Sequence, residues 1–134
     1  LNLFADLQKE FGITYAFITH DISVVSHVSD RIGVLYLGRL MEQGPAGAIS
    51  DHPLHPYTQA LLSAEPLPLP GDLRDNRRRI RLEGEIPSPL NPPSGCPFRT
   101  RCPKAEALCA ERVPEWRELR PEHWVACHFA ESNL

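Results

Sequence analysis

The sequence contains no long apolar run, because no stretch reaches the roughly 18 residues that a membrane-spanning helix requires. It also lacks an excess of basic residues: the formal net charge is −3, which excludes a general attraction to nucleic acids or anionic membranes. Its first residues have no basic region of the kind that begins a signal peptide. With 42% hydrophobic and 23% charged residues, the composition predicts a soluble globular protein.

Cysteine and most of the proline are missing from the first half of the chain. Of 14 prolines, 11 lie at or after Pro66, and all four cysteines lie at or after Cys96. The alternating prolines up to Gly71 are typical of a stiff, extended linker. We therefore predict a boundary there, with an α/β segment over residues 1–65 and a loop-rich α+β tail over residues 66–134. A metal or a partner surface is expected to support so proline-rich a tail.

Most regular structure is expected in the first half. Residues 15–19 are rich in β-branched and aromatic side chains, which predicts a buried strand. The remaining patterns predict helices over 1–11, 22–28, 46–51 and 56–62, and a hairpin of 32–37 with 40–43. In the tail, alternating apolar and polar residues predict strands over 80–86 and 123–129.

His20 and Asp21 lie between the predicted strand and the next predicted helix. Polar residues at the carboxyl end of a buried strand lie where open α/β sheets place ligand-binding groups. Asp21 is a candidate N-cap, since its carboxylate can accept the free backbone N–H groups of the helix. For His20 the residues alone leave two alternatives, a ligand-binding role or a structural one as a cap or a core histidine.

The run 18–43 resembles the end of an ABC-transporter nucleotide-binding domain. Two later runs, HPYTQALLSAEP at 55–66 and GCPFRTRCP at 95–103, are similar to the ATP-binding subunits of oligopeptide and dipeptide importers. The resemblance implies that the chain is the C-terminal part of such a subunit and that its first half belongs to a P-loop, ABC-type fold. It also implies that His20 is the switch-loop histidine, a catalytic and nucleotide-binding residue that contacts the γ-phosphate of ATP.

The motifs that bind ATP are themselves absent. There is no G-x-x-x-x-G-K-[ST] phosphate loop, no strand ending in paired acidic residues and no LSGGQ-like signature. Since the sequence also opens without methionine, we expect a piece of a longer subunit that is inactive by itself. For the full-length subunit, the resemblance implies ATP and Mg²⁺ as cofactors and the cytoplasmic face of the cell membrane as its location. It implies a second ATP-binding subunit and transmembrane permease subunits as partners.

A further expectation concerns association of the chain with itself. The predicted strand 15–19 would leave an exposed sheet edge, and exposed edges favour pairing with another copy. We therefore expect a homodimer, formed by exchange of a strand or a larger element.

The four cysteines, Cys96, Cys102, Cys109 and Cys127, are spaced C-x5-C-x6-C-x17-C. A reducing cytosol disfavours disulfides, and the close cysteine pairs of zinc sites are absent. The wider spacing suits a loop that wraps a [4Fe–4S] cluster held by four thiolates. Zinc, buried free thiols and disulfides formed after oxidation stay as alternatives.

Two other functions stand beside peptide import. One is a metal- or iron–sulfur-stapled interaction or regulatory module without an ATPase role. The other is a nucleic-acid module built on the arginines of residues 72–81. The acidic net charge and the lack of interleaved aromatic residues in that stretch speak against the second, and we predict no nucleic-acid partner.

Overall fold

A computed structural model of the chain describes residues 2–64 and 79–134. The predicted linker and Arg74, Arg77 and Arg78 lie outside these ranges. In chain order the elements are α1 (Asn2–Phe11), α2 (Ile22–Val28), β1 (Arg31–Tyr36), β2 (Arg39–Pro45), α3 (Ala46–Asp51), α4 (Pro56–Ala64), α5 (Ala107–Glu111), β3 (Arg117–Arg120), β4 (His123–Val125) and the 3-10 helix η1 (Ala130–Asn133). In the described part of the chain, no helix is long and apolar enough to cross a membrane.

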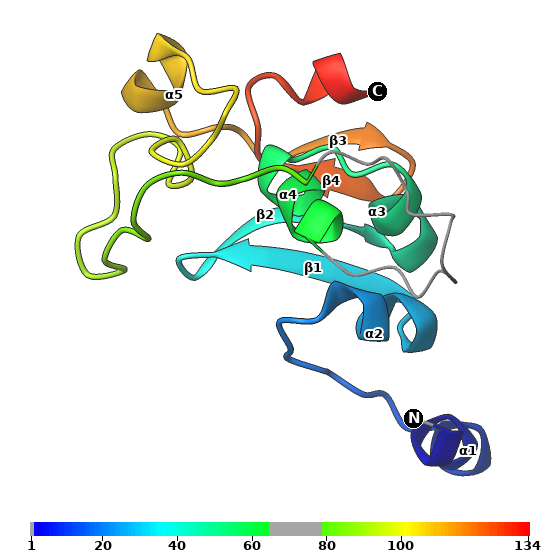
Figure 1. Cartoon of the computed structure of the whole chain (residues 1–134). Coiled ribbons are helices and arrows are strands. Elements are labelled where there is room, and N and C mark those ends of the chain that lie inside the picture. The colour runs from blue at the N-terminus through cyan, green and yellow to red at the C-terminus, as the bar shows by residue number, and fades with distance from the viewer. Residues whose placement is uncertain (1, 65–78) are drawn as a thin grey trace, which may run out of the picture.

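Strands β1 and β2 form the predicted antiparallel hairpin (Figure 1). Side chains along β1 alternate between exposed and buried, with Ile32, Val34 and Tyr36 inward. The turn places Leu37 and Gly38 at φ values of 48° and 75°, the paired positive φ of a two-residue hairpin turn. The predictions of helices in the first half are confirmed as well, by α1, α2, α3 and α4.

The sheet joins the two halves of the sequence. Its strand order is β1-β2-β4-β3, and all neighbours are antiparallel. Glu42 of β2 pairs with Val125 of β4, and Gln43 pairs with Trp124. A strand of the tail thus extends the hairpin of the first half, so the fold is a small α/β domain whose sheet draws on residues from both sides of position 66.

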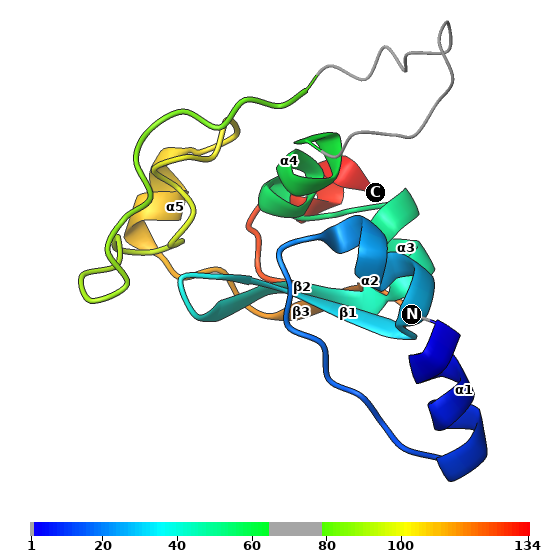
Figure 2. The ribbon, with the colours of Figure 1, turned by 60° about the horizontal axis from the view of Figure 1, so that its bottom comes forward.

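Helices α2, α3 and α4 gather on the same side of the sheet (Figure 2). They bury one apolar cluster that comprises Ile22, Val25, Ile32, Val34, Ala46 and Ile49, with Tyr57, Leu61 and Leu62 packed against it. A second cluster has Phe98 at its centre, with its ring centroid 5.2 Å from those of both Tyr36 and Tyr57. This second cluster packs the tail loops against the hairpin and α4.

The predicted strand over 15–19 is wrong. These residues are extended but belong to no strand, and Ile18 is fully exposed. The physical reason is that a strand is stabilised by the ladder beside it, and in the described ranges no strand lies next to this segment. Tyr15 and Phe17 instead make ring contacts with Phe4 of α1, so α1 and the segment lie apart from the sheet (Figure 1).

The tail departs from its predictions in three places. No strand forms over 80–86, since this stretch finds no partner strand among the residues that the structure describes. The strand predicted over 123–129 is confirmed only as β4, which ends at Val125. Helix α5 and strand β3 were not predicted, because elements of five and four residues are too short to show a period.

Candidate functional site

His20 lies at the start of α2, where its position is set by a local capping structure. The Asp21 carboxylate accepts the N–H of Val24 at 3.2 Å, which confirms the predicted N-cap. The N–H of Asp21 in turn donates to Thr19 Oγ1 at 3.1 Å. The His20 side chain is exposed, and no partner for its ring is found in the described ranges. Its catalytic role stays a prediction.

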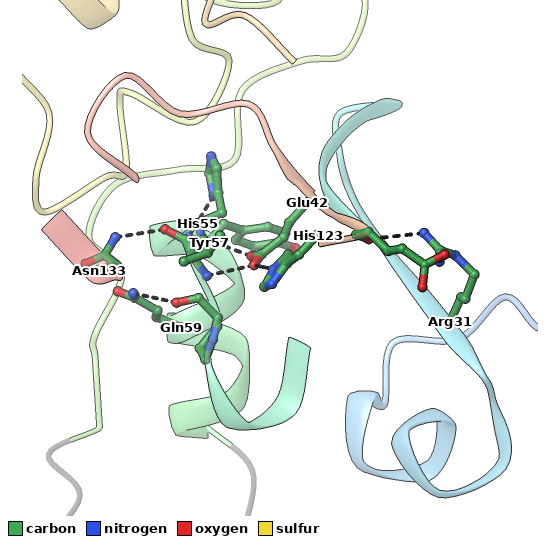
Figure 3. A network of polar contacts seen from close by, with 10 residues as sticks. Arg31, Glu42, His55, Tyr57, Gln59, His123 and Asn133 are labelled. Atoms are coloured by element: carbon green, nitrogen blue, oxygen red, sulfur yellow. Dashed lines mark hydrogen bonds and ion pairs between the residues drawn. The ribbon is translucent and has the colours of Figure 1, made fainter. Parts of the chain in front are cut away.

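A buried carboxylate joins the two halves of the chain. Glu42 and His123 are both 0% exposed, and His123 Nε2 donates to Glu42 Oε1 at 2.7 Å (Figure 3). The same carboxylate accepts the backbone N–H groups of Leu54 at 2.7 Å and His55 at 2.9 Å. These three donors supply the hydrogen bonds that a buried carboxylate needs. One side chain of β2 therefore binds both strand β4 and the connector, residues 52–55, that precedes α4.

Sequence reasoning missed this cluster. Glu42 follows buried Met41, so the strand shows no alternation that marks it as inward, and its partner His123 is far away in the sequence. One signal for the cluster is present in the sequence, at the connector between Pro53 and Pro56. The backbone N–H groups of the residues between these prolines need an acceptor once they are buried. Gly44 makes room for the pair, because a Cβ there would lie 3.2 Å from His123 Cδ2.

His55 lies next to this cluster but faces another region. Its Nδ1 accepts the backbone N–H of Tyr57 at 3.0 Å, and its ring centroid is 5.7 Å from that of Phe98. Burial lowers the pKa of His55 from 6.5 to about 4, so the imidazole is neutral near neutral pH.

The structure places all four cysteines around one pocket. Cys96 and Cys109 are buried, Cys102 and Cys127 are half-buried, and all four are free thiols. The N–H of Cys96 donates to the carbonyl of Cys109 at 2.8 Å. Gly95, at φ +66°, permits this close approach, since a Cβ there would lie 2.2 Å from the Cys109 carbonyl oxygen.

Three of the thiols accept backbone N–H bonds. Burial raises the pKa of Cys96, of Cys102 and of Cys127, the last to about 11. Against this, the N–H of the residue two positions on lowers each of these pKa values, from Phe98, Lys104 and Phe129 respectively. Such donors favour the thiolate, which is the form that binds metals.

The described ranges contain no group of three or more His, Cys, Asp or Glu side chains arranged to hold a metal ion. Neither iron–sulfur nor zinc binding gains support from this arrangement. The four-thiolate centre stays a prediction, although its four proposed ligands do meet around one pocket.

Comparisons with known proteins all match the chain to proteins of peptide transport. Residues 41–109 match the family described as the oligopeptide/dipeptide transporter, C-terminal region. The chain is 55% identical over 130 residues to the oligopeptide transport ATP-binding protein AppF of Bacillus subtilis, covering 96% of this chain and 39% of that protein. It is 51% identical over 134 residues to the di/tripeptide transport ATP-binding protein DppF of Pseudomonas aeruginosa, covering 100% and 40%. The chain thus spans about two fifths of the length of these relatives.

Proposed function

Because the chain belongs to the family of oligopeptide/dipeptide transporter C-terminal regions, we propose that it is the C-terminal part of an ATP-binding subunit that powers peptide import. The observation that carries the proposal is the identity of 51–55% to ATP-binding proteins of peptide transport over nearly the whole chain. The proposed partners are a second ATP-binding subunit and membrane permease subunits, at the cytoplasmic face of the cell membrane. ATP and Mg²⁺ are the proposed cofactors of the longer subunit.

His20 is the proposed catalytic residue. Phosphoryl transfer needs hydrogen-bonding groups aimed at the γ-phosphate, where charge is redistributed in the transition state. A neutral imidazole can donate from one ring nitrogen and accept at the other. The exposed ring of His20, placed by the capped start of α2, is available for this contact. Because the sequence has no phosphate loop, the chain by itself is proposed to be inactive.

The test measures Mg²⁺-dependent ATP hydrolysis by the longer subunit, assembled with its permease in lipid vesicles. His20→Ala is expected to lower kcat by about 10²- to 10³-fold, the cost of removing one such donor, with little change in KM for ATP. His27→Ala is the matched control, since His27 is an exposed histidine on α2, the helix that follows His20. A His20→Ala subunit that turns over like wild type would remove His20 from the mechanism.

The chain in isolation is proposed to dimerise. Its support is the exposed apolar surface of α1 and the following segment, where Leu3, Phe11 and Ile18 are all exposed. Light scattering over a concentration series tests this, and a monomer at every concentration contradicts it.

A second proposal gives the tail a thiolate-held metal centre, a [4Fe–4S] cluster with zinc as the alternative. Its support is limited to the four cysteines, which all line one pocket and are the ligand type that iron–sulfur clusters use. Cys96, Cys102, Cys109 and Cys127 would hold it. Its contribution would be stability, because metal binding can supply much of the folding free energy of a small loop-rich region.

Metal and sulfide analysis of protein purified without oxygen tests this second proposal. Iron and sulfide at about four each per chain are expected for the cluster. Zinc without sulfide would identify a structural zinc site instead. Absence of both would leave the four cysteines as core thiols and overturn the metal proposal, without bearing on ATP hydrolysis.

A further inference from the structure

We propose that a groove between the hairpin and the tail binds a small amphipathic carboxylate, with the apolar body of the ligand in the groove and its carboxylate on Arg39. This hairpin groove is lined by residues 39–41 of β2 and by tail residues that include Trp116 and Ala126. None of the proposed catalytic or metal-binding residues lines it, so the inference does not rest on the proposed function.

The hairpin groove has the size and the lining of a small-molecule site. Its volume is about 330 Å³, and ligand pockets commonly have roughly 300–1,000 Å³. Met41 and Ala126 are its buried residues, while Val113 and Trp116 are 58% and 38% exposed beside them. An apolar ligand that covers these side chains removes their surface from water, which favours binding.

The walls of the groove are held in place by contacts within the chain. The N–H of Ala126 donates to the carbonyl of Met41 at 2.9 Å, which fixes this tail residue against β2. The rings of Trp116 and Trp124 stack, with centroids 6.4 Å apart and planes at 16°. Two other lining residues are prolines, whose φ is fixed. A preformed site loses little conformational entropy on binding, which favours affinity.

The polar side chains of the hairpin groove are donors. Among the described residues, Arg39 is the one charged residue that lines it, and a guanidinium has five N–H donors and no acceptor. The indole of Trp116 adds one N–H donor. Within residues 2–64 and 79–134, neither side chain has a hydrogen bond or an ion pair. The complementary group on a ligand is therefore an anionic acceptor.

A carboxylate matches this donor set. One guanidinium balances its single charge and can hold both of its oxygens through two parallel hydrogen bonds. A phosphate ester carries about −1.5 to −2 charges at neutral pH, more than one cation offsets. No acidic residue of the described chain lines the groove, so an amino acid or a peptide would leave its ammonium group unpaired. The ligand class is therefore a monocarboxylate with an apolar body and no amino group.

The experiment titrates octanoate into the 134-residue chain labelled with ¹⁵N-tryptophan and follows the two indole N–H signals by NMR. The signal of Trp116 is assigned by its loss in Trp116→Phe. Octanol has the same apolar body without the charge, and octylammonium has the opposite charge. Arg39→Gln removes the cation. Arg81→Gln is the matched control, because Arg81 is exposed and lies outside the groove.

Octanoate is expected to move the Trp116 signal in a saturable way. Arg39→Gln is expected to weaken octanoate binding by about 3- to 10-fold, the loss of one charge-assisted contact at a partly exposed site, and to leave octanol binding unchanged. Arg81→Gln should match wild type with both ligands. Octylammonium should bind most weakly, because its charge is repelled by Arg39.

A second variant tests the sign of the charge in the groove. Val113→Glu places a carboxylate at the exposed edge of the groove, where a surface substitution leaves the fold intact. Octanoate binding should weaken by about threefold or more through repulsion between like charges, and octanol binding should weaken less. Leu90→Glu is the matched control, because Leu90 is 95% exposed and lies outside the groove. Circular dichroism checks that each variant is folded.

An Arg39→Gln variant that binds octanoate like wild type, or that loses octanol to the same extent, would overturn the proposal. A Trp116 signal that octanoate does not move would overturn it as well. Light scattering with and without octanoate tests the other occupant, a second copy of the chain. A dimer that octanoate or Val113→Glu converts to a monomer would show that a second copy fills the groove, and this result also contradicts the proposal.

Discussion

At the scale of single residues, a buried carboxylate with no part in the proposed chemistry joins the two halves of the fold. Glu42 accepts hydrogen bonds from two backbone N–H groups of the connector and from the ring of His123. A buried carboxylate is tolerated only when its acceptor capacity is used in this way. The identity of one side chain on β2 therefore fixes the position of the connector and of β4.

Removing this carboxylate should be costly. Glu42→Ala is expected to lower the free energy of unfolding by about 3–5 kcal/mol, because three buried donors lose their acceptor. Glu42→Gln should cost less, since its carbonyl oxygen can still accept. Urea unfolding measures both changes.

Glu122→Gln is the matched control, because Glu122 pairs with Arg31 at the surface at 3.3 Å. A pair this exposed contributes at most about 1 kcal/mol. Equal effects of Glu42→Ala and Glu122→Gln would show that Glu42 is not the junction between the two halves.

His55 predicts a pH dependence of stability. Its pKa is about 4 in the folded chain and 6.5 without burial. Between these values the unfolded chain binds more protons, so stability falls as the pH is lowered from 6.5 to 4, by up to about 3 kcal/mol. Urea midpoints should fall across this pH range in wild type and much less in His55→Gln. His52→Gln is the control and should behave like wild type, because His52 is exposed.

Acid also weakens the contact between Arg117 and Glu131. The comparison of variants cancels this effect. A hydrogen bond from Arg117 holds the pKa of the Glu131 carboxyl below its usual range, and that contribution is lost as the carboxyl is protonated. Glu131 is shared by all these variants, so it cannot account for a difference between them. The same pH slope in His55→Gln as in wild type would contradict the assignment to His55.

At the scale of elements, sequence patterns predicted correctly those elements whose turns, caps or alternation lie within their own residues. The hairpin has an alternating strand and a turn with Gly38, and α2 has its cap in Asp21, so both were predictable. The segment 15–19 has an equally strong composition, but the described part of the chain offers it no neighbouring strand to pair with. The strand propensity of these residues is therefore not sufficient, because a strand also needs a neighbouring strand to pair with.

The features of the candidate site likewise fall into those that the sequence predicted and those that depend on contacts between distant residues. The cysteine spacing allowed a shared site to be predicted, and the four thiols do line one pocket. The Glu42–His123 contact depends on a pairing of β2 with β4 that no local pattern contains. The tautomer of His55 likewise follows from a single contact with Tyr57, visible only once the connector has its three-dimensional form.

Hydrogen exchange separates these two kinds of element. The amides of residues 13–18 are expected to exchange within seconds at neutral pH, because no strand in residues 2–64 or 79–134 pairs with them. Those of β1 and β2 are protected by the hairpin and the core. Mass spectrometry of peptides from the two regions provides the comparison. Equal protection in both would mean that the segment is paired in solution.

At the scale of the whole molecule, the predicted boundary near residue 66 does not divide the sheet. Strand β4 pairs with β2, and Phe98 of the tail packs against Tyr36 and Tyr57 of the first half. The side chain of Asn133, near the end of the chain, donates to the carbonyl of Leu54 at 2.8 Å. His20 and the thiol pocket are therefore carried by one folded unit, and we expect its two halves to unfold together.

Urea unfolding followed by two probes tests this unity most directly. Trp116 and Trp124 both lie in the tail, with stacked rings 6.4 Å apart, so their fluorescence reports on the tail. Pulsed hydrogen exchange of peptides from β1 and α4 reports on the first half. The structure predicts coincident midpoints, as expected for a cooperative unit of this size. A tail that loses its fluorescence signal while β1 and α4 stay protected would show two independent units and contradict the account.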